Sequence, residues 1–211
     1  MQELPIVTKK HIVIFTRYPE AGKTKTRMIP ALGEEGAANL QKQMTEHTLS
    51  QIRKLQKTSV ITLEVRFSGG NYKLMQDWLG KDLVYKIQGS GDLGERMLRS
   101  LTGAFADNAQ QVIIIGTDCP GLNCQIITTA FEKLNNCDLV LGPALDGGYY
   151  LVGLRQPVSE LFSNISWGSD QVFTQTIKIA QKLNLTSSSL PSLADVDRPE
   201  DLKFWQQITN H

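Results

Sequence analysis

Two aspartates stand where apolar segments of the chain give way to small residues. Asp118 follows the β-branched run 112–115, and Asp146 lies between another apolar segment and the pair Gly147-Gly148. Two such carboxylates can hold a divalent cation, or one can bind metal while the other accepts a proton from an acceptor hydroxyl. Asp118 and Asp146 are therefore the candidate catalytic residues.

A third acidic group, Asp195 and Asp197, lies near the end of the chain. Pro199 and two further acids follow it, which is also a good start for a helix, so capping is an equal alternative to ligand binding. For Asp118 the corresponding alternative is that it caps a helix beginning near Asn123.

Four cations follow the first apolar segment, at Arg17, Lys23, Lys25 and Arg27, with Gly22 among them. A loop of this composition can wrap the phosphates of a nucleotide with backbone N–H groups and side-chain charge. The spacing of a Walker A loop is absent. A solvated basic loop is the alternative, because most charge runs are solvated.

A second glycine-rich loop spans residues 89–94 and precedes an amphipathic segment. Its backbone could closely approach a base, a ribose or a phosphate, although an ordinary turn explains the glycines equally well. The candidate substrate contacts of this loop are Gly91, Asp92, Gly94 and Arg96, and Gly147 and Gly148 join them beside Asp146.

Cations after the first strand and acids after later ones fit a phosphate-bearing donor. A leaving nucleoside diphosphate or pyrophosphate gains negative charge in the transition state, and Lys, Arg and a metal ion can stabilise that charge.

The elements that must position these residues alternate along the chain. The run 112–115 is apolar without polar alternation, which predicts a strand buried on both faces of a parallel sheet. Asp118 then lies just past its carboxyl end, where open α/β sheets bind ligands. Further strands are predicted at residues 11–16, 59–67, 83–87, 138–141 and 149–154. Helices are predicted at residues 72–79, near 123–134 and over 170–183, and three more helices are predicted to begin at residue 33, after residue 91 and after residue 199.

This alternation of strands, loops and helices predicts βαβ units around a mostly parallel sheet. The length of 211 residues and the even composition favour one domain over residues 1–211. A net charge of +1 gives no general attraction to nucleic acid or to a membrane.

The three cysteines lack a CxxC pair, so neither a disulfide framework nor a structural zinc site is indicated. Cys119 has no histidine nearby in the sequence, which argues against a catalytic thiol. Residues 1–10 lack the apolar core of a signal peptide and no run is long enough to span a membrane, so we expect a cytoplasmic protein.

Five stretches together carry a family resemblance: residues 15–28 (FTRYPEAGKTKTRM), 91–97 (GDLGERM), 113–122 (IIIGTDCPGL), 141–154 (LGPALDGGYYLVGL) and 195–202 (DVDRPEDL). In this order they resemble the bacterial glycosyltransferase-A-like family labelled nucleotide-diphospho-sugar transferases, a domain-of-unknown-function group related to the phospholactate guanylyltransferases. The resemblance spans nearly the whole chain.

The resemblance implies a three-layer α/β/α fold with a mixed, mostly parallel sheet, and a site that uses Mg²⁺ or Mn²⁺. It implies that Lys25 and Arg27 contact donor phosphates, that Asp118 binds the metal, and that Asp197 completes the metal site. Residues 146–148 would then line the acceptor side.

Two departures from related enzymes affect this assignment. Gly116 replaces the first acid of the Asp-x-Asp motif that glycosyltransferases of this fold usually carry, and the loop after the first strand has only one glycine.

The first hypothesis is a metal-assisted glycosyltransferase that uses a nucleotide-diphospho-sugar donor and a small-molecule acceptor. The alternatives are a nucleotidyltransferase that joins an NMP from an NTP to a phosphorylated metabolite, and a non-catalytic nucleotide-binding module; a homo-oligomer stays open.

Overall fold

The computed structural model describes residues 9–209. The expectation that the N-terminus lacks a signal segment falls mostly on residues 1–8, and these residues, like 210–211, lie outside the described part of the chain.

A seven-stranded sheet runs through the molecule in the order β3-β2-β1-β4-β6-β5-β7. Strand β6 is antiparallel to its neighbours β4 and β5, and the other pairings are parallel. The sheet is therefore mixed and mostly parallel, as the sequence predicts. The strands are β1 (Lys10–Arg17), β2 (Ile61–Ser68), β3 (Val84–Ile87), β4 (Gln111–Ile115), β5 (Leu139–Pro143), β6 (Tyr149–Leu154) and β7 (Ser187–Ser189).

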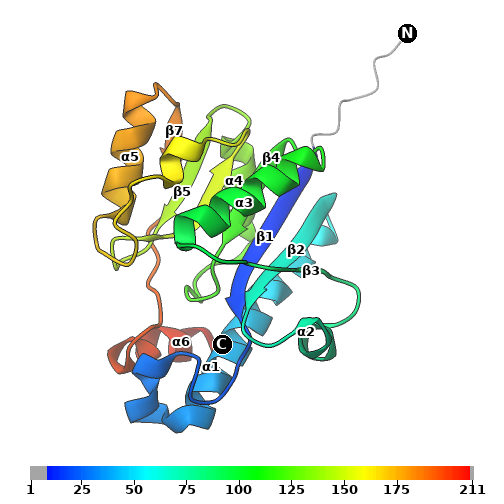
Figure 1. Cartoon of the computed structure of the whole chain (residues 1–211), viewed down its shortest axis with the longest axis vertical. Helices are drawn as coiled ribbons and strands as arrows, with labels where there is room; N and C mark the ends of the chain where they lie inside the picture. The colour runs from blue at the N-terminus through cyan, green and yellow to red at the C-terminus, as the bar shows by residue number, and fades with distance from the viewer. Residues whose placement is uncertain (1–8, 210–211) are drawn as a thin grey trace.

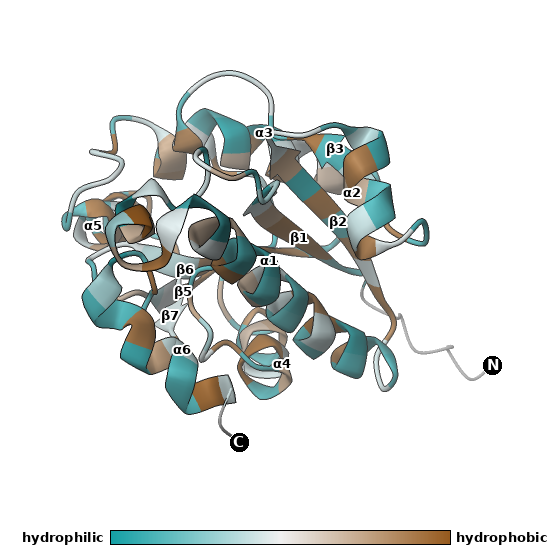
Figure 2. Ribbon diagram, turned by 90° about the horizontal axis from the view of Figure 1, so that it is seen from below, coloured by the Kyte–Doolittle hydropathy of each residue, from teal (hydrophilic) through white to brown (hydrophobic). Residues whose placement is uncertain are grey.

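Helices cover both faces of this sheet and make the three layers visible in Figure 1. One core contains residues of α1, α2 and α4, and the other contains residues of α3, η2 and α5. Strands β1 and β2 are largely hydrophobic in Figure 2, whereas the helices alternate hydrophobic and hydrophilic residues. The helices are α1 (Ile29–Gln56), α2 (Tyr72–Leu79), α3 (Leu93–Ala106), α4 (Cys124–Lys133), α5 (Val172–Lys182) and α6 (Leu202–Thr209), with short 3₁₀ turns η1 (Thr26–Met28), η2 (Ser159–Phe162) and η3 (Pro199–Asp201).

Strand β4 confirms the prediction made from its β-branched run. All five of its residues are buried, and its side chains enter the two cores alternately. Strand β1 pairs with β4 on one side and with β2 on the other. Because the chain leaves β1 toward β2 and later returns to β4, the boundary between β1 and β4 is a topological switch point, where ligands of such sheets bind.

Asp146 lies at the same edge of the sheet as Asp118. Strands β4 and β5 are both antiparallel to β6, so their carboxyl ends meet at one edge. The hairpin between β5 and β6 carries Asp146 there. The prediction that Asp118 and Asp146 share one edge depended on parallel strands, and β4 and β5 do run in the same direction on either side of β6.

Two elements differ from the sequence prediction. Residues 187–189, which have no predicted structure, form the short edge strand β7 beside β5. The first helix begins at Ile29 rather than after Gly33, and Gly33 makes a kink with φ 70°. Other boundaries differ by one or two residues, as frayed ends do. Among residues 9–209 no helix is both long and apolar enough to cross a bilayer.

A third, small core joins the two ends of the described chain. Met28 and Met44 of the α1 region pack with Val196, and residues of α6 surround them. In Figure 1 the red helix α6 lies beside the blue start of α1. This packing brings the segment 194–198 across the carboxyl edge of the sheet.

Candidate functional site

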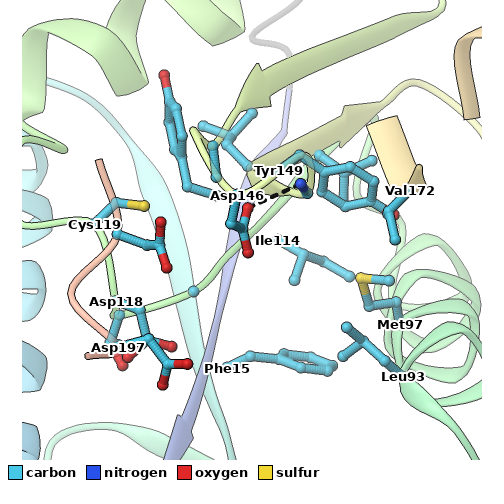
Figure 3. A pocket seen from close by; sticks show the side chains of 18 of the residues that line it. Phe15, Leu93, Met97, Ile114, Asp118, Cys119, Asp146, Tyr149, Val172 and Asp197 are labelled. Carbon is cyan, nitrogen blue, oxygen red and sulfur yellow. Dashed lines mark hydrogen bonds between the residues drawn. The ribbon is translucent and has the colours of Figure 1, made fainter. Parts of the chain in front are cut away.

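A cleft of about 470 Å³ opens at the carboxyl ends of β1 and β4. In Figure 3 the carboxylates of Asp118, Asp146 and Asp197 lie on one side of it. Apolar side chains form the other side, contributed by β1, β4, β6, α3 and the start of α5: Phe15, Leu93, Met97, Ile114, Tyr149 and Val172. The cleft therefore has one charged wall and one apolar wall.

Four aspartates line the charged wall, and they come from three separate segments. Asp118 follows β4, Asp146 lies in the β5–β6 hairpin, and Asp195 and Asp197 lie on the segment that precedes η3. We call these four residues the aspartate wall. The sequence predicts three of them as site residues and weighs Asp195 only as Asp197's neighbour.

The four aspartates differ in their partners. Asp118 pairs with Lys25, and Asp197 pairs with Arg27. Asp146 accepts a 2.9 Å hydrogen bond from the Gly148 backbone N–H, drawn in Figure 3. Within residues 9–209 no salt bridge compensates Asp146 or Asp195.

The electrostatic consequences appear in the ionisable groups around the wall. Burial, and next the charge of Asp146, raise the pKa of Asp195. Burial also raises the pKa of the Cys119 thiol, with further increases from Asp118 and other acids of the wall. Cys119 is thus a protonated core side chain, which agrees with the sequence argument against a catalytic thiol.

Backbone hydrogen bonds hold the segment with Asp195 and Asp197 against the end of β4. The Val196 N–H donates to the Asp118 carbonyl at 2.8 Å, and the Leu193 N–H donates to the Pro143 carbonyl at 3.1 Å. These contacts join residues 50 or more positions apart in the sequence.

The capping alternatives for these aspartates fail. Asn123 caps α4, because its side chain accepts from the Ile126 N–H, so Asp118 is free of that role. Asp201 accepts from the N–H groups of Asp197 and Arg198 at the start of η3.

The basic loop has a different arrangement from the one predicted. Lys23 is exposed and pairs with Glu20, while Gly22 packs beside Glu34. Lys25 is buried against Asp118. Arg17 is the only Lys or Arg among the described residues that line the cleft. The predicted phosphate contacts of this loop stay predictions, and Arg17 has the best position for one.

The glycine-rich loop before α3 serves chiefly to begin that helix. Asp92 caps α3 in a capping box with Glu95, and Arg96 donates to the Gly91 carbonyl. Gly94 packs tightly against the Phe162 carbonyl and the Trp167 ring. The cleft lining includes none of the four predicted loop residues, Gly91, Asp92, Gly94 and Arg96.

Sequence reasoning missed the polar floor of the cleft. Thr16, Gln41 and Thr117 line it, and the Gln41 side-chain nitrogen lies 3.1–3.2 Å from three threonine hydroxyls, the third being that of Thr45. All four side chains are buried. The available signal was the pair Gln41 and Thr45 at i, i+4 spacing, beside Leu40 and Met44 on the buried face of α1.

A second hollow, of about 540 Å³, adjoins the cleft at the aspartate wall. Asp146, Asp195 and Asp197 line both hollows, and so do Gly168 and Ser169. Arg27, Arg198 and Lys203 contribute positive charge to the second hollow. Gly148 lines the cleft, whereas Gly147 packs against the Asp170 backbone.

The carboxylates of the aspartate wall are the groups in this site that could hold a divalent cation. Among residues 9–209 no three His, Cys, Asp or Glu side chains are grouped closely enough to hold a metal by themselves. Mg²⁺ commonly uses one or two carboxylates together with substrate phosphates and water. Two carboxylates of the wall supply the oxygen ligands that this mode requires.

Comparison with protein families matches residues 51–169, more than half of the chain, to a family described as "Uncharacterized protein conserved in bacteria (DUF2064)". The chain belongs to this family. The matched stretch contains Asp118 and Asp146 but neither the basic loop nor Asp197. A search of curated proteins found no significant match.

Among solved structures, one from Desulfovibrio desulfuricans G20, described as a "putative nucleotide-diphospho-sugar transferase", is 31% identical. The alignment covers 96% of this chain and 88% of that one, with a TM-score of 0.85. This finding confirms the resemblance stated from the sequence motifs and the fold class that it implied.

Two more distant structures share the fold at 12% identity, each covering 96% of this chain and 99% of the other. They are CMP:2-keto-3-deoxy-manno-octonic acid synthetase complexed with CTP, with a TM-score of 0.60, and 4-diphosphocytidyl-2C-methyl-D-erythritol synthase from Anaerococcus prevotii DSM 20548, with a TM-score of 0.63. The description of the 31% identical structure as a transferase agrees with the expected transferase class, and the two more distant structures show the shared fold.

Proposed function

We propose that the protein is a metal-assisted glycosyltransferase that uses a nucleotide-diphospho-sugar donor. Three residues of the aspartate wall, Asp146, Asp195 and Asp197, line both hollows, and this arrangement carries the proposal. A transferase must bring two substrates together at the reacting atoms, and residues shared by two hollows provide such a meeting point. The 31% identical structure from Desulfovibrio desulfuricans G20 supports the donor class.

The donor nucleotide would occupy the cleft over the switch point between β1 and β4. Thr16, Gln41 and Thr117 offer hydroxyl and amide groups at its floor, and Arg17 offers positive charge. The apolar wall, with Phe15 and Met97, suits a flat ring of the ligand.

A divalent cation would allow an anionic donor to approach the negative charge of the wall. Lys25 and Arg27 each pair with one aspartate, Asp118 and Asp197, so Asp146 and Asp195 are left to repel a diphosphate. Mg²⁺ or Mn²⁺ held by Asp118 and Asp197, the pair implied by the resemblance, with Asp146 nearby, would stabilise the charge on the leaving diphosphate. The donor phosphates would supply the remaining ligands.

The acceptor would enter from the second hollow. Asp146 belongs to both hollows, so its carboxylate can accept the proton of an acceptor hydroxyl as the new bond forms. In this proposal Asp118 binds the metal ion, and Asp146 is the general base that accepts the proton of the acceptor hydroxyl.

Nucleotidyl transfer is the second candidate, and the two fold neighbours that make cytidine-diphosphate or CMP compounds favour it. In that reaction an NTP would occupy the same cleft, and pyrophosphate would leave. The donor phosphates would again need the metal.

The test is a thermal-shift series with nucleoside diphosphates, their sugars and nucleoside triphosphates, each with and without Mn²⁺. A ligand that binds the folded state raises its melting temperature by mass action. We expect a Mn²⁺-dependent shift with one nucleotide-sugar, lost in Asp118→Asn and retained in the control Asp77→Asn, an exposed aspartate of α2 that pairs with Lys73.

Turnover assays then separate the candidates. Release of nucleoside diphosphate from a nucleotide-sugar supports glycosyl transfer, whereas pyrophosphate release from an NTP supports nucleotidyl transfer. Nucleotide binding that survives Asp118→Asn without any turnover would instead indicate a non-catalytic module.

A further inference from the structure

Lys25 and Lys23 lie two positions apart in the same loop, yet their surroundings are opposite. The Lys25 side chain is 4% exposed, and its Nζ donates to Asp118 Oδ1 at 2.6 Å and to the Val196 carbonyl at 2.7 Å. The Lys23 side chain is 64% exposed and pairs with Glu20. Lys25 is thus part of the interior of the site, whereas Lys23 belongs to the surface.

The backbone of Lys25 has an unfavourable conformation that its surrounding contacts hold in place. Its φ of 45° and ψ of 48° place it in the left-handed region, which is unfavourable for a residue with a Cβ. The turn closes through the Met28 N–H, which donates to the Lys25 carbonyl at 2.8 Å. Such a conformation persists where the surrounding contacts determine it.

Lys25 joins three segments that are far apart in the sequence. Its ammonium group links the basic loop to Asp118 after β4 and to Val196 between Asp195 and Asp197. It lines neither the cleft nor the second hollow. Its position therefore differs from that of a phosphate ligand, which must face the donor.

The ion pair also limits what Asp118 can offer. One carboxylate oxygen, Oδ1, is already bound to a fixed cation, and the carboxylate as a whole remains 56% exposed. A metal ion that uses Asp118 must approach next to the ammonium group. Two nearby cations in a partly buried site repel each other, and this repulsion falls as anionic ligands arrive.

We propose that Lys25 is the permanent counter-ion of Asp118. Lys25 holds the segment 195–197 in place, and it keeps metal binding weak until the donor phosphates enter with the metal. This inference rests on the proposed metal-dependent function. Metal and donor then bind together rather than metal first, because the phosphates offset the charge that Lys25 adds.

The test measures Mn²⁺ binding without nucleotide, by electron paramagnetic resonance of free Mn²⁺, in wild type, Lys25→Met, Lys25→Arg and Lys23→Met. We expect Lys25→Met to bind Mn²⁺ roughly tenfold more tightly, because the competing cation is gone. Lys25→Arg, which keeps the charge, and the surface control Lys23→Met should match wild type. Circular dichroism checks the fold of each variant.

Lys25→Gln provides a second route if Lys25→Met does not fold, since its amide can still donate to the Val196 carbonyl. Unchanged Mn²⁺ affinity in the neutral variants would overturn the proposal, and so would weaker binding of a nucleoside diphosphate measured without metal, which identifies Lys25 as a phosphate ligand. If no nucleotide binds at all, the proposed function fails, but the Mn²⁺ measurement still decides the role of Lys25.

Discussion

Asp118 and Cys119 are adjacent residues with opposite environments. The Asp118 side chain is 56% exposed at the cleft, while Cys119 is buried in the core on the α1 side of the sheet. Both residues line the cleft after the end of β4, but only the Asp118 side chain is open to solvent, whereas Cys119 also packs in the core. The acids of the wall make this difference larger, because they disfavour a thiolate.

Thiol labelling tests this arrangement at the residue scale. Iodoacetamide should modify Cys124 first, because Cys124 is partly exposed while Cys119 and Cys137 are buried and have raised pKa values. Peptide mass spectrometry at increasing reaction times identifies the order. Early modification of Cys119 would contradict the structure.

Helix α3 contains two glycines with different functions. A Cβ on Gly94 would lie 2.5 Å from the Phe162 carbonyl oxygen and 2.7 Å from the Trp167 ring. A Cβ on Gly103 would approach only an arginine nitrogen, at 3.5 Å. The helix can therefore pack closely against η2 and Trp167 at its start, and Trp167 itself lines the cleft.

The two alanine substitutions should consequently differ. We expect Gly94→Ala to lower the free energy of unfolding by about 1–3 kcal/mol through overpacking. Gly103→Ala should be neutral or stabilising by up to about 1 kcal/mol, because alanine favours the helix. Urea denaturation of both proteins gives the comparison, and equal effects would show that the close contact at Gly94 is unimportant.

Strand β7 depends on Asp138 for its place beside β5. The Asp138 carboxylate accepts from the Thr186 backbone N–H at 2.9 Å and from the Thr186 hydroxyl at 2.6 Å. The hydroxyl, and next the backbone N–H, lower the pKa of Asp138. The ionised form is thus the one that holds the edge strand.

The sign of this shift predicts a pH dependence. A carboxyl with a lowered pKa stabilises the fold above its unfolded value, near 3.9, and this contribution disappears as the pH falls through the folded value. Asp138→Ala should lower stability by about 1 kcal/mol at pH 7, and by progressively less below pH 4. Melting curves against pH measure this, with Asp77→Ala as the exposed control, and a constant difference would contradict the interpretation.

At the scale of the whole molecule, stability should decrease from the switch point toward the edges of the sheet. Strands β1 and β4 lie between two hydrogen-bonded neighbours and two covering helical layers. Strands β3 and β7 are at the edges, and β7 has only three residues. The site therefore rests on the most firmly held strands.

Amide hydrogen exchange tests this gradient. Amides of β1 and β4 should exchange only through global unfolding, whereas those of β3 and β7 should exchange through local opening. Exchange followed by mass spectrometry would show the difference in protection. Uniform protection across the sheet would mean that the edges are as stable as the centre.

The sequence alone determined the fold class, the central strand and the candidate aspartates. Continuous β-branched runs such as 112–115 indicate buried strands, and small residues after them mark their ends, so the positions of Asp118 and Asp146 follow from local pattern. The family motifs then identified the fold as a whole.

Only the tertiary structure decided which charges meet. The pairing of Lys25 with Asp118, of Arg27 with Asp197, and the polar floor around Gln41 all join segments that are distant in the sequence. Local spacing cannot encode such contacts, because they depend on how α6 and the segment 194–198 pack across the sheet edge. For the same reason the burial of Lys25 against Asp118 could not be read from the sequence, and the phosphate contact that the family resemblance implies for Lys25 stays a prediction.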